Sequence, residues 1–193
     1  MIIIKNKFLR KKILFISFLD FKEKSIQVIK KTPEIYSKKN WNVDYVVLRD
    51  NSKLDNYYYE NEINPKNVNV YRTYLPFVNL LNFFKNVIFI RRILQKFFYF
   101  FGIFKVINFI KKNNIHKKKY DVLYGYEVYG VIVIWIFKKL GFFKNSKIIH
   151  RFQGSFLYDY ITKINLPKLI SNFDHLFAIS LKADSYIITD DGT

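Results

Sequence analysis

The sequence predicts an α/β fold, with a Rossmann-like and mainly parallel sheet and helices on both faces. Three observations lead to this prediction. Apolar runs of strand length recur along the 193 residues, segments with helical spacing separate them, and turn-forming residues end most of these segments. Strands that alternate with helices favour a parallel sheet, because each helix carries the chain back to the edge where the next strand begins.

The first two predicted strands flank one helix. The continuous apolar run "ILFISF" at 13–18 is typical of a strand covered on both faces. Helical spacing over 22–39 predicts a helix that Pro33 kinks or splits, because proline has no amide hydrogen and clashes with the preceding turn. Asn40 is a helix stop, and "VDYVVL" at 43–48 is the second strand.

The middle of the chain is predicted to contain a loop, a short strand and a long helical stretch. Residues 49–67 are polar and rich in turn formers, and 68–72 form the third strand. Residues 79–112 carry Phe on nearly every turn, with Lys and Arg between. Gly102 is expected to break this stretch into two helices, because glycine is a poor helix former.

The rest of the chain repeats the order of strand and helix. Lys138-Lys139 and Gly141 mark the end of one helix, and Leu166-Pro167 opens another whose apolar residues recur every three or four positions. The expected elements are a strand at 121–125, a helix at 128–140, a strand at 146–152 and a strand at 185–189.

Length and composition indicate one globular domain. Residues 1–12 form a basic lead-in and 13–193 the domain. There is no Cys and the three His are dispersed, so disulfides and thiolate metal sites are excluded and no metal site is expected. No secretory signal is recognisable and no apolar run approaches the ~20 residues of a spanning helix. A cytoplasmic protein is therefore expected, with a peripheral place on the inner face of the membrane as a further possibility.

The net charge of +18, from 33 basic and 15 acidic side chains, has two interpretations. It can attract an anionic partner such as a phosphorylated ligand, nucleic acid or a membrane surface. It can also follow from codon bias in an AT-rich genome. No recognition helix or aromatic RNA-binding signature is present, so a nucleic-acid partner is not expected.

The helical stretch at 79–112 also has two interpretations. Its aromatic residues can pack on the sheet as an ordinary helix pair. Alternatively, Lys85, Arg92 and Lys96, which lie nearly on one line along a helix, can face an anionic membrane. Core packing with a peripheral membrane role is the preferred interpretation.

Candidate site residues follow the predicted strands, because ligands of open α/β sheets bind beyond the carboxyl ends of the strands. The first strand is followed by "SFLDFKEK", and neither G-x-G-x-x-G nor a P-loop occurs. In "HRFQGSF", His150, Arg151, Gln153 and Gly154 bring an imidazole, a guanidinium, an amide and a flexible backbone together. Strand alternation places His150 and Arg151 on opposite faces. A structural role for these residues is the alternative.

Three acidic residues complete the set of candidates. Glu127 is either a first-turn helix carboxylate or a group that binds a hydroxyl. Asp190 and Asp191, in "TDDGT", are either part of a turn or anchors for a hydroxyl.

The order of four motifs resembles the N-terminal half of a GT-B glycosyltransferase of family 4. They are "KKILFISFLDF", "YDVLYGYEVYG", "KIIHRFQGSFLYDY" and "ADSYIITDDGT", which together cover 11–193. The resemblance implies a Rossmann-like domain that shapes the acceptor side of a cleft. It also implies a second, C-terminal domain that binds the nucleotide-sugar donor through a Glu-x7-Glu motif, with no bound metal. The sequence departs from the family in the loop "FLDFKEK", which has no glycine.

The resemblance assigns the acceptor side to His150, Arg151, Gln153 and Gly154, with Asp190 and Asp191 as further candidates. The acceptor would be a glycan or a lipid-linked molecule. Because the sequence ends at Thr193, before any donor domain, no cofactor is expected to bind this chain, and it is expected to be inactive unless a C-terminal half acts in trans. The alternative is a stand-alone basic α/β module that binds anionic membrane lipid or nucleic acid.

Overall fold

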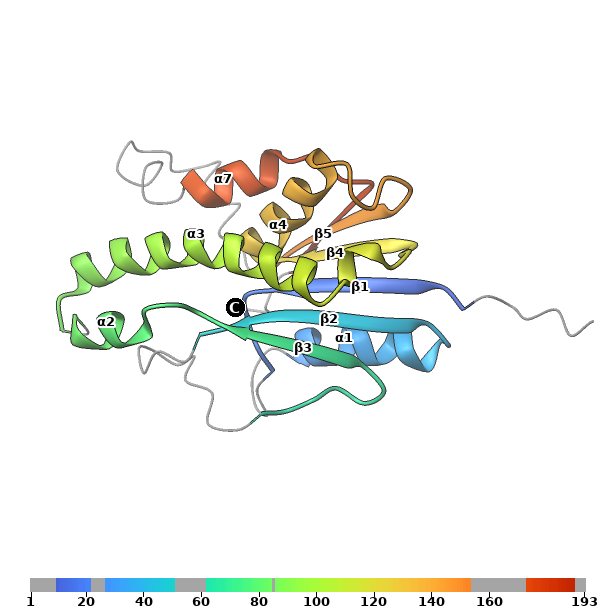
Figure 1. Cartoon of the computed structure of the whole chain (residues 1–193), viewed down its shortest axis with the longest axis horizontal. Coiled ribbons are helices and arrows are strands. Elements are labelled where there is room, and N and C mark those ends of the chain that lie inside the picture. The colour runs from blue at the N-terminus through green and yellow to red at the C-terminus, as the bar shows by residue number, and fades with distance from the viewer. Residues whose placement is uncertain (1–9, 22–26, 51–61, 85, 154–172, 190–193) are drawn as a thin grey trace, which may run out of the picture.

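The computed structural model describes residues 10–21, 27–50, 62–84, 86–153 and 173–189. They contain a six-stranded parallel sheet with the strand order β3-β2-β1-β4-β5-β6 (Figure 1). The strands are β1 (Lys12–Ser17), β2 (Asn42–Arg49), β3 (Asn69–Tyr74), β4 (Val122–Tyr126), β5 (Lys147–Gln153) and β6 (Ser185–Thr189). This is the predicted Rossmann-like α/β fold, and each predicted strand is confirmed to within two residues.

Helices lie on both faces of the sheet, as Figure 1 shows. They are α1 (Gln27–Lys38), α2 (Val78–Phe83), α3 (Ile88–Lys112), the 3₁₀ turn η2 (Ile115–Lys117), α4 (Glu127–Lys139) and α7 (Phe173–Ser180). The predicted stops are confirmed, because Asn40 and Gly141 have positive φ angles and each lies two positions after the last residue of a helix.

Two separate apolar layers hold these helices on the sheet. On one face, Ile29 of α1 packs with Phe15, Tyr45 and Tyr124 of the strands. On the other face, α3, α4 and α7 pack on Leu14, Ile16 and Val46 of the strands, and the helices contribute Val131 of α4 and Ala178 of α7 to this layer. The side chains of each inner strand therefore alternate between two buried layers, which explains why these strands are continuously apolar.

The predicted split at Pro33 is wrong, because α1 runs through this proline. Pro33 is buried, and Ile29 and Tyr36 on either side of it pack against the sheet. We attribute the continuity of α1 to this packing, which holds the two halves of the helix although one backbone hydrogen bond is missing.

The predicted break at Gly102 is also wrong, because α3 is continuous through it and the helical stretch is divided earlier, where α2 ends at Phe83 and α3 begins at Ile88. A Cβ atom at Gly102 would lie 2.5 Å from Leu48 Cδ2 and 3.2 Å from Phe18 Cε2. The glycine thus lets α3 lie close to the sheet, and packing outweighs its low helix propensity.

Helix α3 carries a second, exposed apolar face. Six residues spaced by three or four positions are each 40–54% exposed and fall within about 100° of the helix circumference. They are Ile90, Ile93, Phe97, Phe100, Phe101 and Phe104, and they are called the α3 stripe below. The rings of Phe97 and Phe101 lie 4.7 Å apart, and those of Phe100 and Phe104 lie 5.3 Å apart.

One segment, Ile93–Lys112 of α3, is long and apolar enough to cross a membrane by length and composition, although the sequence was expected to contain no such segment. The opposite face of this segment belongs to the core, where Ile103, Val106 and Ile110 are buried. The high mean hydropathy of α3 therefore has two sources, one packed face and one exposed stripe.

Candidate functional site

The candidate site lies at the carboxyl end of the sheet, where the strand order reverses between β1 and β4. Four of the predicted residues lie in or next to this region. Glu127 follows β4, and His150, Arg151 and Gln153 lie at the end of β5. Tyr126 pairs in register with Arg151, so the end of β4 and the end of β5 lie side by side.

The guanidinium of Arg151 is buried and bonded to neutral groups. Its Nη1 atom donates to Thr32 Oγ1 at 3.1 Å and to Tyr124 Oη at 3.3 Å, and Nη2 donates to Thr189 Oγ1 at 3.4 Å. The guanidinium also lies 5.8 Å from the ring centre of Tyr126. Within the described ranges Arg151 forms no ion pair, and its Nε has no hydrogen-bond partner. A buried cation that forms no ion pair in the described ranges is well suited to receive an anionic group.

Glu127 and Gln153 are joined across the two strand ends. The backbone amide of Gln153 donates to Glu127 Oε1 at 2.7 Å, and the hydroxyl of Tyr126 donates to the side-chain carbonyl oxygen of Gln153. Glu127 opens α4, as one interpretation of the sequence expected, but its carboxyl group contacts β5 and does not cap its own helix. Carboxyl, amide and guanidinium groups are thus brought together within two neighbouring strands.

The backbone and the pKa of Glu127 are both unusual. Its φ angle is +58°, which is a left-handed backbone conformation. Residues other than glycine seldom adopt this conformation, and those that do are often found at functional sites. Burial raises the pKa of Glu127 from 4.5 to about 7, while the amide of Gln153 and the charges of His175 and Arg151 act in the opposite direction. Near neutral pH this carboxyl group can therefore either donate or accept a proton.

A second polar cluster, missed from the sequence, lies at the same edge on β1, β2 and β3. Asp20 accepts two hydrogen bonds from Arg72, from Nε at 3.0 Å and from Nη2 at 3.2 Å, and Arg49 Nη1 lies 3.7 Å from its carboxylate. Asp20 and Arg49 are fully buried. The Asp in "SFLDF" was visible in the sequence, but its partners come from other strands. Glu62 lies 3.6 Å from Arg49 Nη1 and 4.0 Å from Arg72 Nη1, so two carboxylates face two guanidinium groups. The charges therefore compensate one another, and we interpret this cluster as a structural clamp for the loop after β1.

His150 lies on the opposite face of the sheet from Arg151, as strand alternation predicted. Its ring packs edge-on against Phe152 and Tyr186, at 6.5 Å and 5.7 Å between ring centres. Neither ring nitrogen has a hydrogen-bond partner within the described ranges. Burial lowers the pKa of His150 from 6.5 to about 4, and the nearby Leu181 carbonyl opposes this only in part. The structure therefore does not bring His150 together with Arg151 and Gln153.

Replacing His150 by phenylalanine is expected to make the fold more resistant to acid. Because the fold depresses the pKa of His150, the stability is intact above pH 6.5 and is lost as pH falls toward 4, by up to about 3 kcal/mol. His150→Phe lacks this loss, which urea unfolding at pH 7 and pH 4.5 measures. Equal losses of unfolding free energy in the variant and the wild type would contradict the prediction.

The other predicted residues are dispersed or lie outside the described ranges. Gly154, Asp190 and Asp191 lie outside them, as do Lys85 and the side chain of Arg92. Lys96 donates to Asp174 Oδ1 at 2.9 Å, and Asp174 also accepts from Tyr129 at 2.8 Å. The charge of Lys96 thus helps to join α3, α4 and α7. Among the residues the structure describes, no three His, Asp or Glu side chains are grouped to hold a metal ion.

Comparison with known proteins gives a fold relationship. No protein-family model and no curated protein matches the chain. A solved structure of sucrose-phosphate synthase from Thermosynechococcus elongatus matches with a TM-score of 0.51 and 14% sequence identity. The match covers 93% of this chain and 42% of that chain, so this chain spans about two fifths of the length of that enzyme. The chain therefore shares its Rossmann-like fold with one part of that enzyme.

Proposed function

We propose that the chain is the acceptor-side half of a glycosyltransferase, which moves a sugar from a nucleotide-sugar donor to a glycan or lipid-linked acceptor. The observation that best supports this proposal is the buried Arg151, which is hydrogen-bonded only to neutral groups and lies beside the Glu127–Gln153 pair at the switch point of the sheet. The fold shared with sucrose-phosphate synthase supports the reaction class.

Each residue of the candidate site has a separate role in this proposal. Arg151 holds an anionic group of the acceptor, because its guanidinium forms no ion pair in the described part of the chain and its hydrogen-bond partners are neutral. The amide of Gln153 and the carboxyl of Glu127 bind sugar hydroxyls, and Glu127 with its pKa of about 7 exchanges a proton with one of them. The donor binds a second domain in this proposal, and transfer requires both.

A binding experiment with the chain itself tests this assignment. We expect a saccharide linked to a diphosphate to bind more tightly than the same saccharide without it. Arg151→Lys keeps the charge but loses the forked pair of guanidinium donors. It is therefore expected to weaken binding of the diphosphate-linked saccharide about tenfold and binding of the saccharide alone by less than about twofold. Isothermal titration calorimetry measures both. Equal weakening of both ligands would refute the assignment.

The lipid-linked class of acceptor is favoured by the α3 stripe. No Asp or Glu occurs between Glu62 and Asp121, while this region carries twelve Lys and Arg residues. An exposed apolar stripe in a region without acidic residues fits an anionic membrane surface, into which the Phe side chains insert. We propose that α3 holds the candidate site near such a surface.

Removing two rings of the α3 stripe is expected to reduce membrane binding at least about tenfold, because each buried ring contributes roughly 1–2 kcal/mol. Phe97→Ser with Phe104→Ser is the test variant. Leu140→Ser with Phe173→Ser removes two other exposed apolar residues and is the control. Flotation with vesicles of phosphatidylcholine, with and without phosphatidylglycerol, measures binding. If the control weakens binding equally, or if neutral and anionic vesicles bind alike, the proposed membrane contact is wrong.

A further inference from the structure

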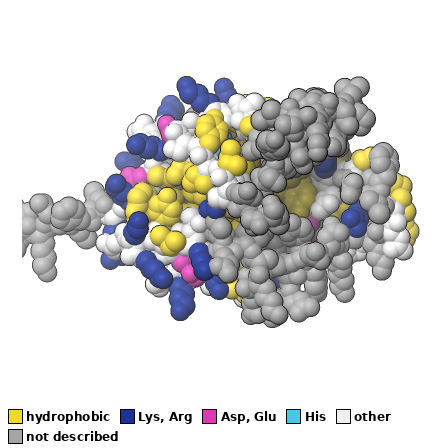
Figure 2. Space-filling model, turned by 180° about the vertical axis from the view of Figure 1, so that it is seen from behind, with side chains coloured by type: hydrophobic (Ala, Val, Ile, Leu, Met, Phe, Trp, Pro, Cys, Tyr) yellow, Lys and Arg dark blue, Asp and Glu magenta, His cyan; other side chains and the backbone are white. Residues whose placement is uncertain are grey.

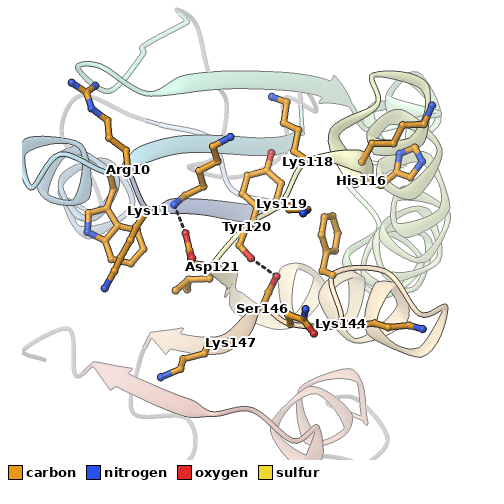
Figure 3. A pocket seen from close by; sticks show the side chains of 16 residues that line it. Arg10, Lys11, His116, Lys118, Lys119, Tyr120, Asp121, Lys144, Ser146 and Lys147 are labelled. Atoms are coloured by element: carbon orange, nitrogen blue, oxygen red, sulfur yellow. Dashed lines mark hydrogen bonds between the residues drawn. The ribbon is translucent and has the colours of Figure 1, made fainter. Parts of the chain in front are cut away.

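A basic cavity lies at the amino ends of the strands, on the edge of the sheet opposite the candidate site. Its volume is about 930 Å³. Figure 3 shows that its lining comes from the lead-in to β1, the segment after η2, the loop after α4 and the start of β5. It is called the basal cavity below. Ligands of parallel sheets bind at the other edge, so the proposed glycosyl transfer does not account for this cavity.

Cationic side chains dominate the lining of the basal cavity. Lys118 is already engaged, because its Nζ donates to Asp44 at 2.9 Å and to Tyr71 at 3.0 Å, and Lys11 lies over the ring of Trp41 at 5.5 Å. Six further cations line the cavity without any ion pair in the described ranges: Arg10, Lys12, Lys117, Lys119, Lys144 and Lys147. Figure 2 shows the corresponding end of the molecule, at the left, with many Lys and Arg side chains and few acidic ones.

The single acidic residue of the lining, Asp121, can offset only one of these six positive charges. Asp121 accepts a hydrogen bond from the backbone amide of Lys12 at 2.7 Å and so fixes the start of β1. The backbone amides of Asn42, Asp121 and Lys147 are bonded to neighbouring strands, and Ser146 Oγ donates to the Tyr120 carbonyl at 2.6 Å. The frame of the cavity is thus satisfied by its own hydrogen bonds, and the lysine ammonium groups remain to bind a ligand.

We propose that the basal cavity binds a small anion with two or more linked phosphate groups. Six unpaired cations around one hollow repel one another, and a polyphosphate relieves this repulsion more than a single phosphate does. Lysine ammonium groups bind phosphate as point charges. The volume is that of a small-ligand pocket, and the concave shape favours a compact ligand over a flat bilayer.

Calorimetric titration of the whole chain with inorganic tripolyphosphate tests the proposal, with inorganic phosphate for comparison. One tripolyphosphate is expected to bind per chain, more tightly than phosphate and more weakly as salt rises. Lys119→Ala with Lys147→Ala is expected to weaken binding at least about tenfold. Lys30→Ala with Lys105→Ala removes the same charge elsewhere and is expected to weaken it less than about twofold. The emission of Trp41, which lines the cavity, reports local binding in a Trp135→Phe background.

Three results would overturn the proposal. Equal weakening in the two double variants would show attraction to the overall charge and no site. Heat release on titration with tripolyphosphate, without a change in the emission of Trp41, would also show that there is no binding site in the basal cavity. Tighter binding of a single-stranded oligonucleotide, with an affinity that grows with its length, would assign this surface to nucleic acid. None of these results depends on glycosyl transfer, so the test stands apart from the proposed function.

Discussion

Replacing Gly130 with alanine is expected to destabilise the fold by about 3 kcal/mol and to lower the melting temperature by roughly 6–12 °C. Gly130 lies in the first turn of α4, where the helix crosses the end of β1. A Cβ atom at this position would lie 2.2 Å from the carbonyl oxygen of Ile16 and 3.1 Å from its carbonyl carbon. Both are backbone atoms of the central strand, so the clash can be relieved only if α4 or β1 moves.

Gly102→Ala is the matched control for this prediction. Both glycines lie inside helices, so alanine gains about 1 kcal/mol of helix propensity at either position. At Gly102 the close atom is Leu48 Cδ2, the end of a side chain that can rotate away. We expect Gly102→Ala to change the unfolding free energy by less than about 1 kcal/mol. Urea unfolding of both variants measures the difference, and equal destabilisation would contradict our account of α4.

The second large effect is expected from Glu127→Gln and depends on pH. Burial raises the pKa of Glu127 to about 7, compared with 4.5 in an unfolded chain, which corresponds to about 3 kcal/mol. Because the folded pKa is raised, the fold carries no penalty below pH 4.5, loses stability as pH rises, and carries the full penalty above pH 7. A neutral glutamine avoids the penalty and can still accept the hydrogen bond from the Gln153 amide.

The measurement is the difference in unfolding free energy between Glu127→Gln and the wild type. It is expected to be near zero at pH 4.5 and up to about 3 kcal/mol in favour of the variant at pH 8. His150 titrates in an overlapping range with the opposite sign, so the difference between the two proteins, and not the wild-type curve, isolates Glu127. A difference that does not change with pH would show that Glu127 is ionised in the fold as in water.

Such a result bears on function as well as stability. Glu127 is a destabilising carboxyl group in a left-handed backbone conformation at the switch point of the sheet. The protein therefore retains this residue at a cost in stability. The stabilised Glu127→Gln variant is therefore expected to bind the proposed acceptor less well. This trade-off is characteristic of residues that contact a ligand.

Part of the candidate site could be predicted from residue order alone. Because side chains alternate along a strand, "HRFQG" placed His150 and Arg151 on opposite faces, and the strand end located Gln153 at the carboxyl edge. Which of these residues meet could not be predicted. The hydrogen bond from Gln153 to Glu127 spans 26 residues, and the neutral partners of Arg151 come from α1, β4 and β6.

The sequence by itself determined the strands, the parallel sheet and the helix stops at Asn40 and Gly141, because these follow from local periodicity and backbone preference. Only the tertiary structure decided that α1 continues through Pro33 and α3 through Gly102, because packing against the sheet outweighs local propensity. It also decided which cations form no ion pair in the described ranges, namely Arg151 and six cations of the basal cavity. Compensation depends on which side chains from distant segments come within a few ångströms, and no local pattern in the chain encodes that distance.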